Sequence, residues 1–303
     1  MAAPRAAAHH RRVTANLSAL LLDDRLPEAR DAPALRGPWG EWTLGELAAR
    51  AGATAGALRD AGLRRGDTVV VALPDVPAWA AVVLGAARLG AVCALLSPGA
   101  PPERRDDAIR RAAPRMVVAS DPAGAGGAPC LRLADLAAAV AARPHDPGPA
   151  ATRWDDPCYM LLTSGSTGRP KWAVHRHGDV RACLATYGAR ILRLRPGDVT
   201  WSVAALPTSY GFGNSCYFPL GAGACAWIDG GDRSPGALVR AIRDGGVDVV
   251  LGVPTWWSRV ARHAVQGRIP RTAFARVRLA VSAGEHLPAR VWRDVRDALG
   301  LRL

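Results

Sequence analysis

One short loop holds the densest group of anion-binding side chains in the sequence. Residues 163–171 read TSGSTGRPK and lie between two apolar stretches that we predict to be strands. Gly165 and Gly168 allow backbone angles that are closed to other residues, so successive N–H groups can turn toward one anion. Further donors come from the hydroxyl groups of Thr163, Ser164, Ser166 and Thr167. This combination predicts a cradle for phosphate oxygens.

Lys171 strengthens that prediction, because it is the only lysine in a chain with 39 basic residues. Its compact ammonium group suits phosphate oxygens. The loop is not of the Walker A type, since no GK[ST] follows the glycines and a strand rather than a helix is expected next. The alternative is a Ser/Gly-rich hairpin turn without a ligand, which fewer specialised residues could form.

The segments around this loop alternate between strand-like and helix-like patterns, which predicts βα units and a largely parallel sheet. Thr43 and Glu46 have the spacing of a capping box, and the apolar residues that follow recur at helical intervals as far as Leu58. Expected strands cover residues 68–73, 91–96, 115–120, 158–163, 171–175, 199–204, 224–228, 247–252 and 277–283. Expected helices cover residues 43–58, 77–89, 103–111, 131–142, 179–192 and 288–299, with two more after Ser234 and Thr255.

Residues 121–149 are rich in Gly, Ala and Pro, and we expect the seam between two α/β units there. Hydrophobic residues make up 49% of the chain and charged residues 21%, enough for a substantial core. The prediction is therefore an α/β protein with two packed, parallel-rich subdomains. The first covers residues 1–150, and the second, with the phosphate loop, covers residues 151–303.

Composition excludes several other classes of protein. The net charge is +13, but the basic residues are spread along the chain near acids, so we expect no nucleic-acid surface. The six cysteines are scattered without a CxxC pair, which predicts a reducing, cytoplasmic compartment with neither disulfides nor a zinc site. The most apolar stretch, residues 82–96, is short for a membrane span and contains Arg88, so we expect a buried helix and strand there.

The stretch YMLLTSGSTGRPKWAVHRH, residues 159–177, resembles the signature of the AMP-forming acyl- and aryl-CoA synthetases. Their superfamily also includes luciferases and peptide-synthetase adenylation domains. Residues 42–98 are similar to the N-terminal region of this family throughout. Residues 206–228, 247–260 and 277–292 match later segments of the family in the same order, and their sequences are most similar to those of benzoate-CoA ligase-like members. The resemblance thus covers nearly the whole chain and implies the N-terminal domain of an adenylate-forming enzyme.

In this family a carboxylate attacks the α-phosphorus of Mg-ATP to give an acyl-adenylate and pyrophosphate, and a thiol, usually that of CoA, then takes the acyl group. The resemblance implies that Lys171 has a catalytic role and closes over the β- and γ-phosphates. The phosphates would be held by Thr163, Ser164, Gly165, Ser166, Thr167 and Gly168. The adenine would lie along Ser282, Ala283, Gly284 and Glu285, which without the resemblance form an ordinary βα turn.

The resemblance also places one wall of the acyl pocket at residues 208–214, with Thr208, Tyr210, Gly211 and Gly213 as substrate-binding residues. The alternative for this segment is a helix-entry turn that packs aromatic rings into the core. Thr208 stands where the family often has an aromatic residue or histidine, so this wall is altered. Two tryptophans either border the same pocket or belong to the core, Trp256 and Trp257. Trp172 replaces the glycine that commonly follows the loop lysine.

The family continues past the position of Leu303 into the acidic Mg²⁺ ligand, a ribose-binding aspartate and a C-terminal lid domain with a further lysine. We expect these parts to be absent here, so the fold would be incomplete at the C-terminus. Within the chain, no histidine spacing predicts a metal ligand. Activity of the chain by itself stays open.

The sequence supports two hypotheses about function. The first is ATP-dependent activation of a carboxylic acid, expected to be aromatic, for thioester formation with CoA or a carrier-protein thiol. The second is a non-catalytic nucleotide-binding remnant of such a ligase.

Overall fold

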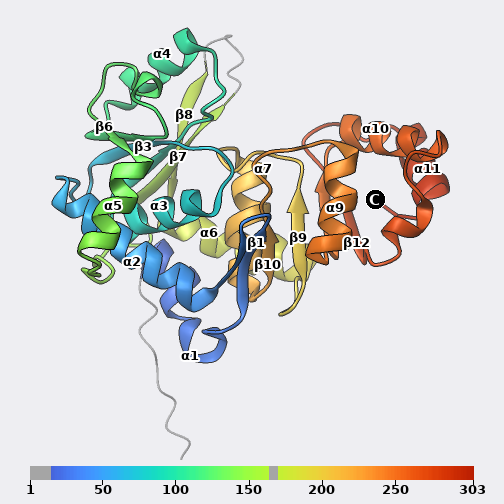
Figure 1. The fold of residues 1–303 in the computed structure, drawn as a ribbon, viewed down its shortest axis with the longest axis horizontal. Coiled ribbons are helices and arrows are strands. Elements are labelled where there is room, and N and C mark those ends of the chain that lie inside the picture. Colours follow the sequence, from blue (N-terminus) through green and yellow to red (C-terminus); the bar gives the residue numbers. More distant parts are fainter. Residues whose placement is uncertain (1–14, 164–169) are drawn as a thin grey trace, which may run out of the picture.

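Two six-stranded sheets organise the computed structural model, which describes residues 15–163 and 170–303 (Figure 1). The first sheet has the strand order β6-β5-β3-β4-β7-β8. Its strands are β3 (Thr68–Ala72), β4 (Val92–Leu95), β5 (Met116–Ala119), β6 (Cys130–Arg132), β7 (Pro157–Thr163) and β8 (Lys171–Arg176). Neighbouring strands pair in parallel except β7 and β8, which form an antiparallel hairpin.

The second sheet has the order β12-β11-β9-β10-β1-β2. Its strands are β1 (Pro33–Gly37), β2 (Gly40–Thr43), β9 (Val199–Ser202), β10 (Cys225–Trp227), β11 (Val249–Gly252) and β12 (Leu279–Ser282). Only the β1–β2 pair is antiparallel. The predicted α/β class with two parallel-rich units is therefore confirmed.

Each sheet contains strands from both sides of the seam that we expected near residue 150. The hairpin β7–β8, which follows residue 150, completes the first sheet, whereas β1 and β2, near the start of the chain, complete the second. A cut at residue 150 would separate strands that pair with each other. The division of the chain into domains at that position stays a prediction, and the sheets do not follow it.

Helices separate and flank the sheets. The first part of the chain contains η1 (Ala19–Asp23), α1 (Leu26–Ala29), α2 (Leu44–Asp60), α3 (Pro77–Arg88), α4 (Pro102–Ala112), η2 (Pro122–Ala125) and α5 (Leu133–Ala142). The predicted capping box of α2 is confirmed, because Glu46 N donates to Thr43 Oγ1 at 3.2 Å and Thr43 N donates to Glu46 Oε2 at 2.9 Å.

The later helices are α6 (His177–Cys183), η3 (Leu184–Leu192), α7 (Ser209–Phe212), η4 (Gly213–Tyr217), α8 (Phe218–Ala222), α9 (Pro235–Gly245), α10 (Pro254–Val265), η5 (Arg271–Phe274) and α11 (Ala289–Leu299). The helix expected at 179–192 begins two residues earlier, at His177, and its second half, η3, is π-helical. The spacing of hydrophobic residues does not distinguish π-helical from α-helical hydrogen bonding, so the sequence could not predict this change.

The alternation of side chains along β3 shows how the layers are arranged. Val69 and Val71 belong to a large core cluster shared with α2, α3 and strands of the second sheet, while Val70 and Ala72 belong to a smaller cluster with α4. A further cluster packs the far face of the second sheet against α9, α10 and α11. Helices α2 and α3 therefore line the core common to both sheets, and α4 and the group α9–α11 lie outside it (Figure 1).

The cysteines and the apolar stretch of residues 82–96 both lie in the described part of the chain. All six cysteines lie in the described part of the chain and are free thiols. Within residues 15–163 and 170–303, no helix combines the length and the hydrophobicity needed to cross a membrane. The apolar stretch that contains Arg88 forms the buried helix α3 and the strand β4, as expected.

Candidate functional site

The hairpin β7–β8 holds the two ends of the predicted phosphate loop. Thr163 is the register partner of Lys171, and its Oγ1 donates to the carbonyl oxygen of Lys171 at 3.3 Å. Both side chains are exposed at the mouth of the hairpin. The other predicted phosphate-binding residues, Ser164, Gly165, Ser166, Thr167 and Gly168, lie outside the described residues. The predicted strands on either side of residues 164–170 are confirmed, whereas a Walker A loop leads into a helix.

Trp172, next to Lys171, ties the start of β8 to α4. Its indole Nε1 donates to the carbonyl oxygen of Ala108 at 3.0 Å, and its ring packs against the cluster on that face of the first sheet. A glycine at this position would make neither contact. The bulky residue therefore anchors the backbone beside the loop lysine.

The segment Ser282–Glu285 follows the carboxyl end of β12. Gly284 has φ +85°, a left-handed conformation that favours glycine. Glu285 is exposed, and its Oε1 accepts a hydrogen bond from Thr255 Oγ1 at 3.1 Å. Ser282 Oγ is buried and has no hydrogen-bond partner among the described residues. Since buried hydroxyls normally find a partner, this oxygen is available to a ligand group.

Thr208 begins the short helix α7 as its N-cap. Its Oγ1 accepts from Gly211 N at 3.0 Å and donates to the carbonyl oxygen of Ala205 at 2.7 Å. A Cβ at Gly211 would lie 1.9 Å from the same carbonyl oxygen, so only glycine fits. A Cβ at Gly213 would lie 3.0 Å from the Phe218 ring.

Phe212 is buried, with its ring edge-on to Trp79 and Tyr159. The segment therefore forms a helix-entry turn that packs Phe212 into the core and leaves Thr208 exposed, while its role as a pocket wall stays a prediction.

Two of the predicted segments meet at one backbone oxygen. The carbonyl oxygen of Gly252, the last residue of β11, accepts from Tyr210 Oη at 3.2 Å and from Ala283 N at 3.2 Å. Burial raises the pKa of the Tyr210 phenol, which keeps its donor proton. The predicted acyl-pocket wall and the predicted adenine segment are therefore adjacent at the carboxyl ends of β11 and β12, where ligands bind in parallel α/β sheets.

Trp256 and Trp257 have core positions. Trp257 is fully buried, and its Nε1 donates to the carbonyl oxygen of Val281 at 2.9 Å. Trp256 stacks at a tilt on Trp201, with ring centroids 5.1 Å apart, and its Nε1 donates to the carbonyl oxygen of Arg233 at 2.8 Å. These contacts support β11 and β12 from beneath, as the core interpretation predicted.

Sequence reasoning missed the ion pair that connects this region to the first sheet. Arg233 donates to Asp75, and Asp75 Oδ1 accepts from the backbone N–H of Leu206, two residues before Thr208. Leu206 and Arg233 lie 131 and 158 positions from Asp75 in the chain, and no local pattern links them to it. The only sequence signal for Asp75 was an acidic residue close to the carboxyl end of an apolar strand, three positions after Ala72.

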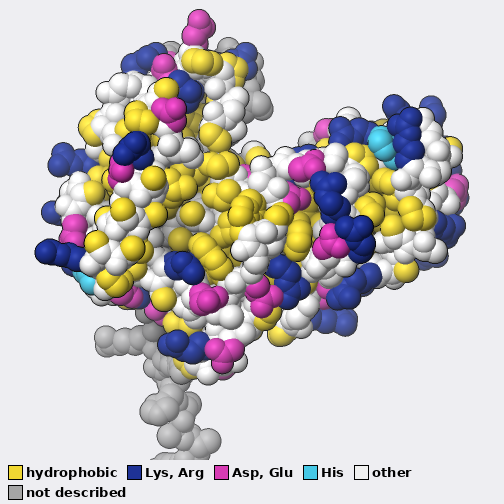
Figure 2. Space-filling model, in the orientation of Figure 1, with side chains coloured by type: hydrophobic (Ala, Val, Ile, Leu, Met, Phe, Trp, Pro, Cys, Tyr) yellow, Lys and Arg dark blue, Asp and Glu magenta, His cyan; other side chains and the backbone are white. Residues whose placement is uncertain are grey.

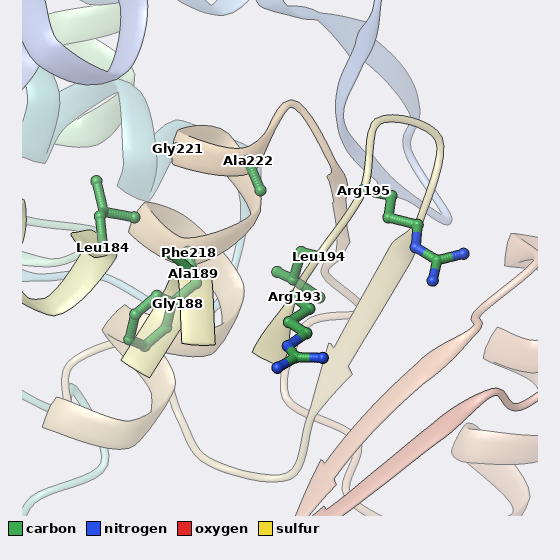
Figure 3. A pocket seen from close by; sticks show the side chains of 9 residues that line it. All are labelled: Leu184, Gly188, Ala189, Arg193, Leu194, Arg195, Phe218, Gly221 and Ala222. Atoms are coloured by element: carbon green, nitrogen blue, oxygen red, sulfur yellow. The ribbon is translucent and has the colours of Figure 1, made fainter. Parts of the chain in front are cut away.

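A separate cavity of about 460 Å³ lies beside η3 and α8 (Figure 3). Leu184 and Phe218 form its apolar wall, while Arg193 and Arg195 extend from the chain before β9 in different directions (Figure 3). The two guanidinium groups do not converge on one point, so the cavity does not form an anion site. It also lies at the amino end of β9, away from the carboxyl ends where the segments above meet.

No group of three or more His, Cys, Asp or Glu side chains within residues 15–163 and 170–303 could hold a metal ion. His175 stacks on Tyr159, with ring centroids 4.7 Å apart, and its Nδ1 lies 3.4 Å from Asp179 Oδ2. His177 is buried beneath the N-terminal segment, and His286 is exposed.

Comparison with known proteins gives a consistent result. The sequence model of a family described as AMP-binding enzyme matches residues 22–303. Benzoate–CoA ligase from Thauera aromatica is 32% identical over 285 residues, which cover 86% of this chain and 54% of the relative. The p-hydroxybenzoic acid–AMP ligase of Mycobacterium marinum is 35% identical over 278 residues, which cover 88% of this chain and 38% of the relative.

The fold matches as well. The crystal structure of a benzoate CoA ligase from Burkholderia xenovorans superposes with a TM-score of 0.86 at 25% identity, covering 95% of this chain and 59% of that one. The chain spans about half or less of the length of the two curated relatives.

Proposed function

The chain belongs to the AMP-binding enzyme family, and we propose that it provides the nucleotide- and acid-binding part of a ligase that activates an aromatic carboxylic acid with ATP. The names of the relatives support the aromatic class, since they are a benzoate–CoA ligase and a p-hydroxybenzoic acid–AMP ligase. The acyl-adenylate would then pass to a thiol. CoA is the acceptor that the first name suggests, and a carrier-protein thiol is the alternative.

The observation that carries this proposal is the shared acceptor at Gly252. The Tyr210 hydroxyl and the Ala283 N–H meet at its carbonyl oxygen, which brings the proposed acid wall and the proposed adenine segment together. An enzyme that joins a carboxylate to the α-phosphate of ATP must hold these two reactants in contact. The bond from Ala283 N continues the parallel β11–β12 ladder, and the hydrogen bond from the Tyr210 hydroxyl is the contact that brings the proposed acid wall to this edge of the sheet.

In this proposal Thr163 and Lys171, at the mouth of the β7–β8 hairpin, hold the β- and γ-phosphates together with the residues of the loop between them. The ammonium group of Lys171 offsets negative charge on the pyrophosphate that leaves when the carboxylate oxygen attacks the α-phosphorus. Ser282 Oγ, buried and without a partner in the described chain, fits a hydrogen bond to the nucleotide.

Mg²⁺ accompanies ATP in the proposed reaction, but the described residues offer no cluster that fits it. We therefore assign no metal ligand to this chain and no step to the ion. We place the protein in the cytoplasm, a compartment in which its six free thiols would remain reduced.

ATP binding tests the phosphate loop directly. We expect Lys171→Ala to weaken binding of a fluorescent ATP analogue about tenfold or more, the effect of losing a charge-assisted contact. Arg293→Ala is the matched control, because it removes one exposed positive charge on α11, a helix that packs on the far face of the second sheet. Equal affinity of wild type and Lys171→Ala would remove Lys171 from the proposal.

Acid-dependent exchange of pyrophosphate into ATP tests the reaction. We expect benzoate or a hydroxybenzoate to support more exchange than acetate, either with the chain alone or after addition of the complementary C-terminal part of a relative. ATP binding without exchange under both conditions, for every acid in the series, would favour the non-catalytic nucleotide-binding hypothesis.

A further inference from the structure

An apolar cavity of about 290 Å³ lies among β2, α2, α3 and α5, apart from the site described above. Its walls include Ala81 and Val82 of α3 and Leu136 and Val140 of α5. No residue of the hairpin β7–β8, of the Thr208 segment or of Ser282–Glu285 lines it. The volume is at the lower limit of ligand pockets, so it suits a small molecule.

Arg50 places a positive charge at this cavity. Its guanidinium carbon lies 4.3 Å from the centroid of the Trp42 ring, and both residues line the cavity. The nearest acid on the same helix face, Glu46, accepts from Thr43 N in the capping box. Among the described residues, no carboxylate forms an ion pair with Arg50. The stacked guanidinium is thus held in place with its hydrogen-bond donors free.

Helix α5 forms an apolar wall that little else covers. Leu136 is its only fully buried residue, although nearly every residue of the helix is Ala, Leu or Val. Its one acid, Asp135, is paired with Arg132 at 2.7 Å and is not available to Arg50. Figure 2 shows hydrophobic side chains gathered on this face around α5 and α3. An apolar surface beside one unpaired cation matches a molecule with an apolar body and a single negative charge.

We propose that this cavity binds a small amphipathic carboxylate, with its apolar part against α3 and α5 and its carboxylate on Arg50. A carboxylate matches the planar guanidinium in two parallel hydrogen bonds. A phosphate ester with two charges would leave one of them without a cation, because Arg50 is the only basic residue that lines the cavity. The site is a second acid-binding site, independent of the proposed acyl pocket.

The test uses octanoate as the carboxylate and octan-1-ol as an uncharged molecule of the same length. Isothermal titration calorimetry with the full chain should show saturable binding of octanoate and weaker binding of octan-1-ol. We expect Arg50→Ala to weaken octanoate binding about tenfold and to leave the alcohol unaffected. Arg104→Ala, an exposed arginine on another helix, should change neither.

A second variant fills the cavity and leaves the charge in place. Ala137 is exposed on α5 and lines the cavity, so Ala137→Trp should block binding of both molecules while the circular dichroism spectrum stays unchanged. Octanoate binding that is equal in wild type, Arg50→Ala and Ala137→Trp would overturn the proposal. So would a chain that sediments as a dimer, becomes a monomer on Ala137→Trp substitution and binds no octanoate, because the cavity would then be an interface between two copies.

Discussion

The guanidinium of Arg233 donates to the buried carboxylate of Asp75 and so connects the loop after β10, in the second sheet, to the chain after β3, in the first. The Asp75 side chain is 7% exposed. Its other oxygen accepts from Leu206 N at 3.1 Å, and the second arm of Arg233 donates to Asp229 at 2.9 Å. The carbonyl oxygen of Arg233 also accepts from Trp256. One ion pair therefore positions the chain leading to Thr208 relative to both sheets.

Asp75→Asn tests how much this ion pair stabilises the fold. The amide keeps an acceptor for Leu206 N but removes the negative charge opposite Arg233, which is 24% exposed. Arg233 keeps its pair with Asp229, so the loss of one of its two carboxylate partners should lower the free energy of unfolding by about 1–3 kcal/mol, measured by urea denaturation. Asp232→Asn, which breaks the exposed pair with Arg240, should cost less than about 1 kcal/mol. Equal stability of Asp75→Asn and wild type would show that the pair contributes nothing net.

Arg88 forms a second buried ion cluster, at the end of α3. Its side chain is 7% exposed and donates to Asp146 at 2.7 and 2.6 Å and to Asp23 at 2.5 and 3.1 Å. Arg88→Met should lower the free energy of unfolding by about 2–4 kcal/mol, because the two carboxylates lose their shared partner. Arg65→Met, which breaks an exposed pair with Asp156, is the matched control and should cost about 1 kcal/mol or less. Two variants with the same unfolding midpoint would contradict this expectation.

Local patterns were sufficient to predict most helices and strands of this fold. The capping box at Thr43 and Glu46, the apolar runs of β3 to β5 and the hairpin around the phosphate loop all depend on residues close in sequence. The family resemblance added which segments would share a site, and the two segments that meet at Gly252 are among those it indicated.

Long-range pairing was not predictable in the same way. The sequence patterns predicted β7 as a strand but missed β1 and β2, and hydrophobic alternation does not indicate which sheet a strand joins. The expected seam at residue 150 therefore does not follow the sheets. The partners of Arg88 and Asp75 lie 58 or more residues away. The shared acceptor at Gly252 is a backbone oxygen, and side-chain motifs cannot indicate it.

Trp172 provides a test of the strand that leads out of the phosphate loop. Trp172→Gly removes both the hydrogen bond to Ala108 and the ring packing, so it should lower the free energy of unfolding by about 2–4 kcal/mol. Trp172→Phe removes the hydrogen bond but keeps an aromatic ring for most of the packing, so it should cost about 1–2 kcal/mol. If Lys171 binds phosphate, the affinity for a fluorescent ATP analogue should be lower in Trp172→Phe than in wild type, and lowest in Trp172→Gly. Trp39→Gly, at a ring that is 48% exposed, should leave that affinity unchanged. Tighter nucleotide binding by Trp172→Gly would contradict an anchoring role.

His177 connects stability to pH through one buried contact. Its ring is fully buried, and its Nδ1 accepts a hydrogen bond from Leu17 N at 3.0 Å. A proton on Nδ1 would point at the N–H of Leu17 and break this hydrogen bond. Burial disfavours the charged ring and lowers the pKa of His177 to about 4. The neutral ring therefore holds the N-terminal segment against the start of α6.

The lowered pKa of His177 gives a definite sign to the pH dependence. Between pH 6.5, the ordinary pKa of histidine, and pH 4, the unfolded chain binds a proton that the folded chain does not, so stability falls as the pH falls. The titration of His177 should make the free energy of unfolding about 2 kcal/mol lower at pH 5 than at pH 7.5. His177→Asn offers Leu17 N an acceptor that does not titrate, so its urea-unfolding free energy should lose about 2 kcal/mol less over that range. The same slope in His177→Asn and wild type would mean that another group titrates.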